Sequence, residues 1–419
     1  MNYYPISLLA ELGERLTPDG APVREGLARG RYLFFNPLLR GAMRGIDAVS
    51  GLRHRLDTTL PADFAPRRIL VCMQAHIGDL IYASAVIPVL RAAFPQARID
   101  FLVHPAAAVL LADHPEVHTL HTATHWKLDR GAGSRAQKLL RHAREQRVLR
   151  ARLRECRYDF ALDLYAYFPN SIPLLAAARI PVRLGWASGG FGGQLTHARD
   201  WRGHGQHVLT WHRMLLDAIP ACRAHLDALR PSLPLPLAGR IACARRLHAA
   251  GIDGAYLCFH VGAGAPYKRW NESDWIALAA TCRKRGDQIV LLGFGRDEIA
   301  LATRIAAAVP GSANLAGLLD FNALAACIAG ARAVVGLDSM AAHLAAAFDV
   351  PLVGVFPGVL DDSWRPAGRK TIVVSTPMPC APCYLPTGCS QMTCLRRTHA
   401  SAVLAALDSL LQTPEPSHA

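Results

Sequence analysis

Asp79 is the first residue of the chain whose position suggests chemistry. It ends the turn 74–79, which follows the continuously apolar residues 69–73 and precedes apolar residues at helical spacing. In parallel sheets such turns lie at the carboxyl ends of strands, where ligands bind. Asp79 therefore qualifies as a general base, and the alternative is a helix cap, a position that Asp favours. A nicotinamide-binding turn does not fit, because Gly78 is its only glycine.

A loop in the second half of the chain, residues 260–270, has the composition of a phosphate-binding loop. Small residues, among them Gly262 and Gly264, let backbone N–H groups approach a phosphate, and Lys268 supplies positive charge. The alternative is an ordinary glycine loop with exposed cations. The loop is a candidate seat for a nucleoside diphosphate.

A second loop follows another apolar run and contains Gly295, Asp297 and Glu298. A carboxylate at such a turn can hold the hydroxyl pair of a ribose. The sequence does not choose between the two acids, and either could instead cap the next helix.

A third loop, residues 336–343, passes from a predicted strand into a predicted helix. The N–H groups at a helix start attract diphosphate. We expect Ser339, the neighbouring backbone amides and His343 to contact the ligand, although His343 could equally be a buried core residue. Asp338 would repel phosphate, so we expect it to cap and shape the turn.

Four of the eleven cysteines form a cluster with the spacing C-x2-C-x5-C-x4-C. They are Cys380, Cys383, Cys389 and Cys394. Four thiolates on a short loop suit tetrahedral zinc or iron in a structural role, with no open position for catalysis. The alternative is free thiols, or pairs that oxidise outside the cell.

Predicted strands and helices alternate along most of the chain, which indicates parallel α/β domains. The proline-rich residues 231–236 fit a linker. We therefore predict a helical extension in residues 1–60 and two Rossmann-like domains, in 61–232 and 233–419. By analogy with nucleotide-sugar transferases of the GT-B type, the first is expected to be the acceptor domain and the second the nucleotide-sugar domain. We expect strands at 69–73, 98–104, 160–164, 182–186, 256–261, 288–292, 331–337 and 352–356, and helices at 272–285, 298–309 and 341–348.

The formal net charge of +14 predicts an acidic partner. Eight basic residues and one acidic residue, Glu145, lie between residues 135 and 154. This is either a solvated helix face or a surface for phospholipid headgroups or a phosphorylated glycan. We take His76, Arg141 and Arg144 as acceptor-binding candidates. Nucleic acid is disfavoured, because no aromatic stacking pattern accompanies the charge.

Residues 8–16 and 32–52 have amphipathic helical character, with basic residues beside apolar ones. Such pieces lie on a membrane or pack against the body of the protein. No apolar run is long enough to span a bilayer and no secretory signal is evident, so we expect a cytoplasmic protein. The glycine-rich loop 187–205 is expected to be mobile and to close over a substrate.

Several motifs occur in the order seen in glycosyltransferase family 9, which contains the ADP-heptose:lipopolysaccharide heptosyltransferases. They are Ala-His-Ile-Gly-Asp at 75–79, the loop 260–270 with its lysine, Asp-Ser-x-x-x-His at 338–343, Phe-Pro-Gly at 356–358 and Trp-x-Pro at 364–366. The resemblance covers about residues 67–407. This chain departs from the family pattern at residues 262–265, which lack hydroxyl side chains, and at Met340, where glycine is usual.

The resemblance implies a GT-B fold, in which two Rossmann-like domains face each other across a cleft. It also implies inverting transfer of a heptose from ADP-heptose to a glycan hydroxyl, with Asp79 as base and with phosphate contacts from Lys268 and the 338–343 turn. No catalytic cofactor is expected. The implied acceptor is an anionic glycolipid of the lipopolysaccharide core, reached at the cytoplasmic face of the inner membrane.

Two alternatives remain open. One is an autotransporter-type protein heptosyltransferase, which belongs to the same broad family, and comparable cysteine clusters in its members support the metal prediction. The other is a non-catalytic sugar-nucleotide-binding protein that kept the fold. The altered positions Gly264 and Met340 are compatible with it, whereas the presence of both Asp79 and Lys268 argues for an enzyme.

Overall fold

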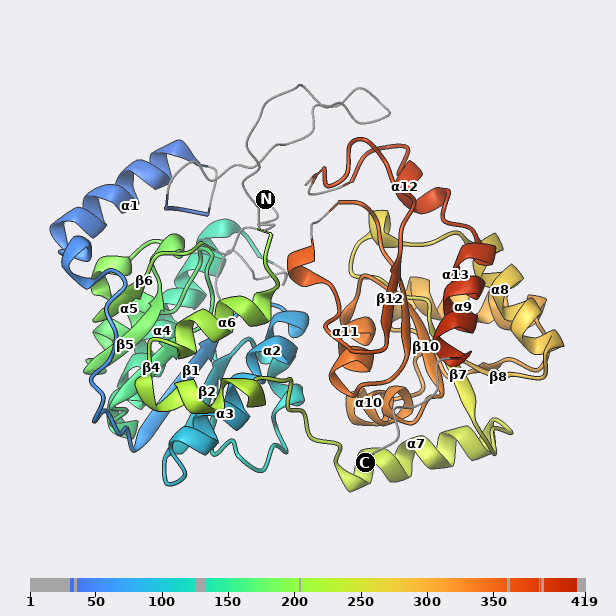
Figure 1. Cartoon of the computed structure of the whole chain (residues 1–419), viewed down its shortest axis with the longest axis horizontal. Coiled ribbons are helices and arrows are strands. Elements are labelled where there is room, and N and C mark those ends of the chain that lie inside the picture. Colours follow the sequence, from blue (N-terminus) through green and yellow to red (C-terminus); the bar gives the residue numbers. More distant parts are fainter. Residues whose placement is uncertain are drawn as a thin grey trace. The chain divides into compact units, whose positions relative to one another are not determined.

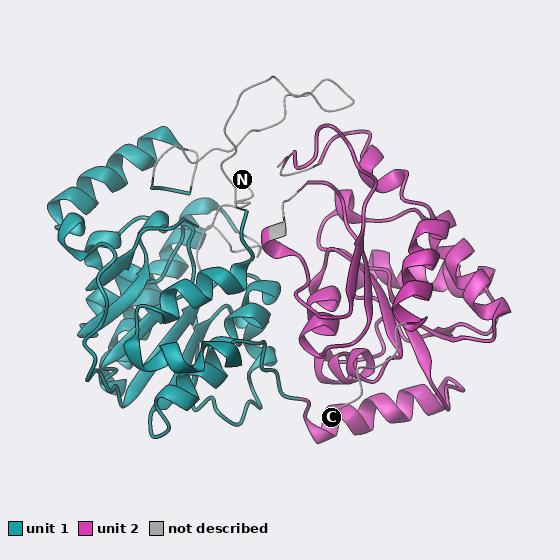
Figure 2. Ribbon diagram, in the orientation of Figure 1, with its two compact units in different colours: residues 1–11, 25–234 teal, residues 12–24, 235–419 magenta. Residues whose placement is uncertain are grey.

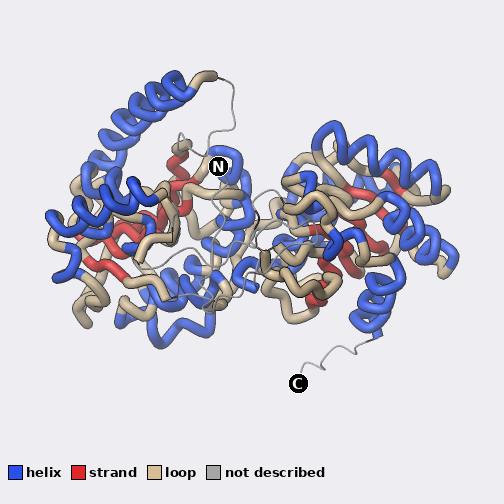
Figure 3. The backbone as a smooth tube through the Cα atoms, turned by 90° about the horizontal axis from the view of Figure 1, so that it is seen from above, coloured by secondary structure: helices blue, strands red, loops and turns tan. Residues whose placement is uncertain are grey.

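The computed structural model describes residues 31–33, 36–124, 133–202, 205–359, 362–383, 385 and 388–412. Two compact units divide this part of the chain between residues 234 and 235, within the proline-rich segment (Figure 2). In each unit the strands run through the middle and helices surround them (Figure 3). The predicted helix at 8–16 lies outside the described residues.

The first unit contains a sheet of six parallel strands in the order β3-β2-β1-β4-β5-β6 (Figure 1). The strands are β1 (Arg68–Met73), β2 (Arg98–Val103), β3 (Leu120–Thr122), β4 (Phe160–Asp163), β5 (Val182–Trp186) and β6 (His197–Arg199). The helices are α1 (Pro37–Val49), α2 (Ile77–Ala83), α3 (Val86–Ala93), α4 (Arg135–Cys156), α5 (Ile172–Ala177) and α6 (Val208–Leu216). The residues of β1 after Arg68 and those of β4 before Asp163 are all apolar, because parallel strands are buried on both faces.

The second unit contains another sheet of six parallel strands, in the order β12-β11-β10-β7-β8-β9. The strands are β7 (Tyr256–His260), β8 (Gln288–Leu292), β9 (Ala313–Asn314), β10 (Ala333–Leu337), β11 (Leu352–Val355) and β12 (Thr371–Val374). The helices are α7 (Leu237–Ala249), α8 (Glu272–Lys284), α9 (Gly295–Ala308), α10 (Phe321–Ala329), α11 (Met340–Ala347), α12 (Thr393–Arg396) and α13 (Ala400–Gln412).

The two sheets have the same strand order. Counted from the first strand of each unit, it is 3-2-1-4-5-6, the order of a Rossmann sheet. The direction of winding reverses between β1 and β4 in the first unit and between β7 and β10 in the second. Ligands of such sheets bind at this reversal, beyond the carboxyl ends of the strands. The predicted α/β fold class, with two Rossmann-like sheets, is therefore confirmed.

The helix predicted within residues 32–52 packs against the body of the first unit. α1 starts after Asn36, whose side chain caps it by accepting hydrogen bonds from two backbone N–H groups. Met43 and Asp47 face inward, and Asp47 accepts hydrogen bonds from Tyr32 Oη (2.8 Å) and Gly193 N (3.0 Å). Of the two sequence interpretations, packing against the protein is the one that the structure supports.

This packing also changes the interpretation of the loop 187–205. A Cβ at Gly193 would overlap Ser50, and a Cβ at Gly190 would lie 2.8 Å from Met43 Sδ. These glycines allow close approach of α1, so residues 187–194 pack against this helix. Closure of the loop 187–205 over a substrate stays a prediction. None of the helices in the described chain is both long and apolar enough to cross a bilayer.

Candidate functional site

Two loops of the second unit leave the sheet side by side at its reversal point. β7 pairs with β10, and His260 lies opposite Gly336 near the carboxyl ends of both strands. The loop after β7 contains Lys268, and β10 leads directly into α11. The sheet therefore brings the first and third predicted phosphate loops together.

Lys268 and Asp338 form an ion pair between these loops. Lys268 Nζ lies 2.6 Å from Asp338 Oδ2, and each side chain is only 14% exposed. The sequence assigned Asp338 to capping, but the N-cap residue of α11 is Ser339, and the Asp338 carboxylate contacts the lysine instead. Asp338 thus fixes the ammonium beside the start of a helix through a charge-assisted hydrogen bond.

The start of α11 offers polar groups to an anion. Ser339 makes no capping hydrogen bond, and its Oγ is buried without a partner among the described residues. The first-turn N–H groups, including that of Met340, form the positive end of the helix dipole. His343 lies one turn later on the buried side of the helix and is 7% exposed. The core interpretation of His343 thus agrees with its burial.

Glu298 ties the second predicted loop to the first. Its Oε2 accepts a hydrogen bond from Phe294 N at 2.6 Å, and its carboxylate lies against Gly262, where a Cβ would overlap it. Burial raises the pKa of Glu298, and backbone hydrogen bonds from Phe294 and Ala263 oppose the shift. Of the two acids of the second loop, Glu298 is therefore the one that contacts the first predicted phosphate loop.

Asp297 differs from its neighbour. It is exposed and pairs with Arg269, with Nη2 and Oδ2 3.0 Å apart. Gly295, whose φ is +76°, begins α9 and lets the chain turn sharply before these acids. A Cβ at Gly264 would meet no atom within 4 Å, so the Gly264 side of the loop is open.

Asp79 lies at the reversal point of the first sheet, in the first turn of α2. Its Oδ2 accepts hydrogen bonds from His76 N at 2.7 Å and lies 3.2 Å from His76 Nδ1. Asp79 is therefore not the N-cap residue, which is His76, but the N3 residue of a capping box. The Asp79 side chain is 10% exposed, and Oδ1 has no hydrogen bond within the described chain, whereas the His76 side chain is more than half exposed. The cap fixes the carboxylate through Oδ2.

The sequence missed two buried polar residues in this part of the first unit. His212 on α6 has its pKa lowered to about 4 by burial, and the nearby Asp79 charge opposes that shift. Asp163 ends β4, and its oxygens accept hydrogen bonds from Tyr165 N and Ser171 N, both at 3.1 Å. Burial raises the pKa of Asp163 to about 7. Its position after the apolar run of β4 was the available signal, whereas His212 lies on a helix that was not predicted.

Arg141 and Arg144 lie on the exposed surface of α4. This helix is buried only through Leu149 and Leu153, so its amino-terminal half has no buried side chain. A helix that follows a parallel strand starts near the carboxyl edge of the sheet. The structure thus places both arginines on the half of α4 nearer that edge, without showing a contact to Asp79.

The four clustered cysteines are free thiols. Cys380, Cys383 and Cys394 are buried in the core of the second unit, and half-buried Cys389 accepts a hydrogen bond from Met392 N. Burial raises the pKa of Cys383 to about 11, and the other three thiols add to the shift. No group of three or more His, Cys, Asp or Glu within the described ranges is arranged to hold a metal ion. The predicted structural zinc or iron therefore has no support from the described residues.

Comparison with known sequences points to one family. The sequence profile of glycosyltransferase family 9 (heptosyltransferase) matches residues 146–391. Lipopolysaccharide heptosyltransferase 2 of Salmonella typhimurium is 30% identical over 332 residues, which cover 73% of this chain and 87% of that protein. Lipopolysaccharide heptosyltransferase 1 of Pseudomonas aeruginosa is 26% identical over 373 residues, which cover 83% and 99%.

A solved structure is similar over both units. The Escherichia coli ADP-heptose lipopolysaccharide heptosyltransferase II aligns with a TM-score of 0.64 and 25% identity, covering 82% of this chain and 98% of that one. Neither unit alone could supply such coverage, so the similarity includes both sheets.

Proposed function

Because this chain belongs to glycosyltransferase family 9, the heptosyltransferases, we propose that it transfers a heptose from ADP-heptose to a hydroxyl of a lipopolysaccharide-core-type acceptor, with inversion at the anomeric carbon. The protein is a glycosyltransferase with a GT-B fold. The donor, the acceptor and the stereochemical course are the parts that the proposal adds.

The Lys268–Asp338 ion pair beside the start of α11 is the observation that carries the donor assignment. A diphosphate at Ser339 would meet the Lys268 ammonium and the free N–H groups of the helix together. The unpartnered Ser339 hydroxyl supplies a further donor. We assign the ribose hydroxyls to Glu298 in preference to Asp297, because Glu298 lies against the same loop through Gly262.

We assign the role of general base to Asp79. Its Oδ1 takes the proton of the acceptor hydroxyl while that oxygen attacks the anomeric carbon. The bond between this carbon and the diphosphate breaks, and ADP leaves with the electron pair. Negative charge grows on the departing phosphate, where fixed donors stabilise the transition state most effectively. Lys268 and the α11 terminus supply these donors, so no step is assigned to a metal ion.

The surface charge of the first unit supports an anionic glycolipid as acceptor. The exposed residues Arg141 and Arg144 on α4 attract phosphate groups of a lipid or glycan. The solvent side of α1 adds Leu38 and Val49, both more than four-fifths exposed. We therefore place the enzyme at the cytoplasmic face of the inner membrane, in peripheral contact with it.

A transfer assay tests the proposal. ADP-heptose and lipopolysaccharide from a heptose-deficient strain are mixed with the full chain, and ADP release and product mass are measured. Asp79→Asn should lose about 10²- to 10⁴-fold in turnover while ADP still binds, since Asn can still accept the His76 N–H hydrogen bond. Lys268→Met should weaken ADP-heptose binding about tenfold or more, through loss of a charged hydrogen bond.

Lys284→Met, on the exposed surface of α8, is the matched control and should behave as wild type. Near-normal turnover of Asp79→Asn would remove Asp79 from the mechanism. Binding of ADP-heptose without any transfer would favour the non-catalytic alternative. Transfer to a protein hydroxyl, and none to lipopolysaccharide, would favour the autotransporter-type enzyme.

A further inference from the structure

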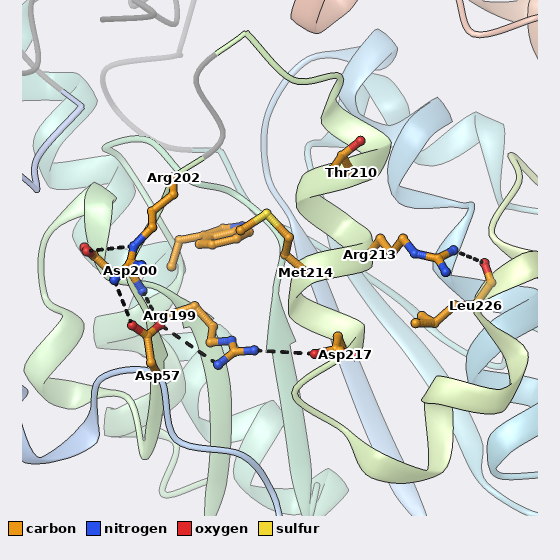
Figure 4. A pocket seen from close by; sticks show the side chains of 10 residues that line it. Asp57, Arg199, Asp200, Arg202, Thr210, Arg213, Met214, Asp217 and Leu226 are labelled. Atoms are coloured by element: carbon orange, nitrogen blue, oxygen red, sulfur yellow. Dashed lines mark hydrogen bonds and ion pairs between the residues drawn. The ribbon is translucent and has the colours of Figure 1, made fainter.

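A pocket of about 430 Å³ opens in the first unit beside α6 (Figure 4). Its walls come from the ends of β5 and β6, the segment around Asp57, and the side of α6 that carries Thr210 and Met214. The volume lies in the range of small-molecule sites. None of the site residues predicted from the sequence lines it.

Arg199, at the end of β6, is a charged group in this pocket that lacks hydrogen-bond partners. Its side chain is 16% exposed, and the nearest carboxylate oxygens, Asp57 Oδ1 and Asp217 Oδ2, each lie 4.0 Å away. These distances are too long for hydrogen bonds. Both contacts are ion pairs, drawn as dashed lines in Figure 4, so the charge of the guanidinium is balanced while its five N–H donors make no hydrogen bond to these carboxylates. The geometry points to an acceptor that enters from the pocket.

A second polar group at the pocket also lacks a partner. Trp186 ends β5 and lies in the wall, fully covered from solvent, and its Nε1 has no acceptor among the described residues. Met214 and Leu226 add apolar surface. A ligand with both C–H faces and hydroxyl groups, such as a sugar, would contact the apolar side chains with its C–H faces and the polar groups with its hydroxyls.

The charges of the lining balance. Three arginines, Arg199, Arg202 and Arg213, and three aspartates, Asp57, Asp200 and Asp217, line the pocket. Arg199 and Arg202 pair with these aspartates across the lining. Neighbouring donors and acceptors match vicinal hydroxyl groups, each of which donates one hydrogen bond and accepts others. With equal numbers of arginines and aspartates, the lining has no net charge to attract a phosphorylated or carboxylated sugar.

We propose that this pocket is a binding site for a neutral sugar unit of the acceptor glycan, and this proposal rests on the proposed function for the identity of the glycan. β6 is three strands from β1, which leads to Asp79, a separation of about 14 Å across the sheet. The pocket therefore holds a sugar other than the one that reacts. The enzyme then contacts the acceptor glycan at two places, the reacting hydroxyl and this second sugar.

Binding measurements on the full chain test this site separately from catalysis. The probes are the methyl glycoside of a neutral heptose disaccharide and the same disaccharide with one phosphate, titrated by ligand-observed NMR. Wild type should bind the neutral probe and bind the phosphorylated one more weakly. Arg199→Met should weaken binding of the neutral probe about tenfold or more. Thr210→Tyr, which fills the pocket and keeps every charge, should do the same.

Arg245→Met, on the exposed surface of α7, is the matched control and should bind as wild type. ADP binding should be unchanged in all variants, and an unchanged near-ultraviolet circular dichroism spectrum and melting temperature would show that the first unit is folded. Equal affinity of wild type and both pocket variants, or no binding by wild type, would overturn the proposal. Tighter binding of the phosphorylated probe would overturn its assignment to a neutral sugar. The transfer assay is independent of these results, so failure here leaves the proposed reaction intact.

Discussion

Gly262 illustrates how a single missing side chain shapes the donor site. The Glu298 carboxylate occupies the space where a Cβ at this position would lie. Gly262→Ala should displace Glu298 from its hydrogen bond with Phe294 N and reduce the free energy of unfolding by about 1–3 kcal/mol, the usual cost of overpacking. Urea unfolding and ADP titration would measure the loss of stability and of binding.

Gly264→Ala is the control for this prediction. Its added Cβ would meet no atom within 4 Å, so stability should change by less than about 0.5 kcal/mol. If both alanine variants behave alike, steric contact with Glu298 is not what requires glycine at position 262.

His260, the last residue of β7, makes stability depend on pH. It is buried, both ring nitrogens lack partners within the described residues, and desolvation lowers its pKa to about 4. In the unfolded chain this imidazole has its ordinary pKa of about 6.5. The stabilisation that comes from a neutral His260 is therefore fully present above pH 6.5 and is lost as the pH falls toward 4. The full effect is about 3 kcal/mol.

His260→Leu should therefore flatten the decline in unfolding free energy between pH 7 and pH 4.5, measured by urea titration at each pH. Exposed His54→Leu serves as the control and should keep the wild-type decline. Parallel pH profiles for wild type and His260→Leu would show that the buried imidazole is not responsible.

At the scale of elements, α1 is held to the first unit by one buried carboxylate. Asp47→Ala would leave Tyr32 Oη and Gly193 N without their acceptor, at a cost of about 1–3 kcal/mol for each unsatisfied group. We expect faster amide hydrogen exchange in residues 37–55, detected by mass spectrometry. Asp47→Asn retains an acceptor and should restore most of the protection. Unchanged exchange in Asp47→Ala would mean that Met43 packing alone fixes the helix.

The central elements were predictable from the sequence, whereas the edges of the sheets were not. Buried strands such as β1 and β7 are apolar runs, which only a parallel sheet covered on both faces explains. The edge strands β3, β6, β9 and β12 are two to four residues long and partly exposed, so they lack such a run. Because β6 was missed, the pocket beside it was missed as well.

The candidate site shows the same limit. Turns after apolar strands located Asp79 at one sheet and Lys268 and Ser339 at the other, because within each sheet the topology brings the strand ends to one edge. The Lys268–Asp338 pair depends on side-chain geometry between two distant loops, and no local spacing encodes it.

At the scale of the whole molecule, the net charge of +14 predicts salt-dependent binding to anionic bilayers. Vesicles containing phosphatidylglycerol should retain the protein at 0.1 M salt and release it at 1 M, where the screening length falls to about 3 Å. Combined reversal of Arg141, Arg144 and Arg147 to Glu should weaken the binding about 100-fold. Cosedimentation would measure the bound fraction.

The matched control reverses three exposed arginines of α7, Arg240, Arg245 and Arg246, and changes the net charge by the same amount. If both triple variants bind equally weakly, total charge controls the association and α4 has no special role. Indifference of wild type to the vesicles would favour a protein acceptor.

The repeated strand order has an evolutionary and practical consequence. Each unit is a complete sheet with its own reversal point, and the described chain passes from one to the other once, between residues 234 and 235. Recombination at that junction would exchange one half of the enzyme and leave the other intact. Chimaeras with relatives could thus pair one protein's nucleotide-sugar preference with another's choice of glycan, and each specificity could diversify on its own.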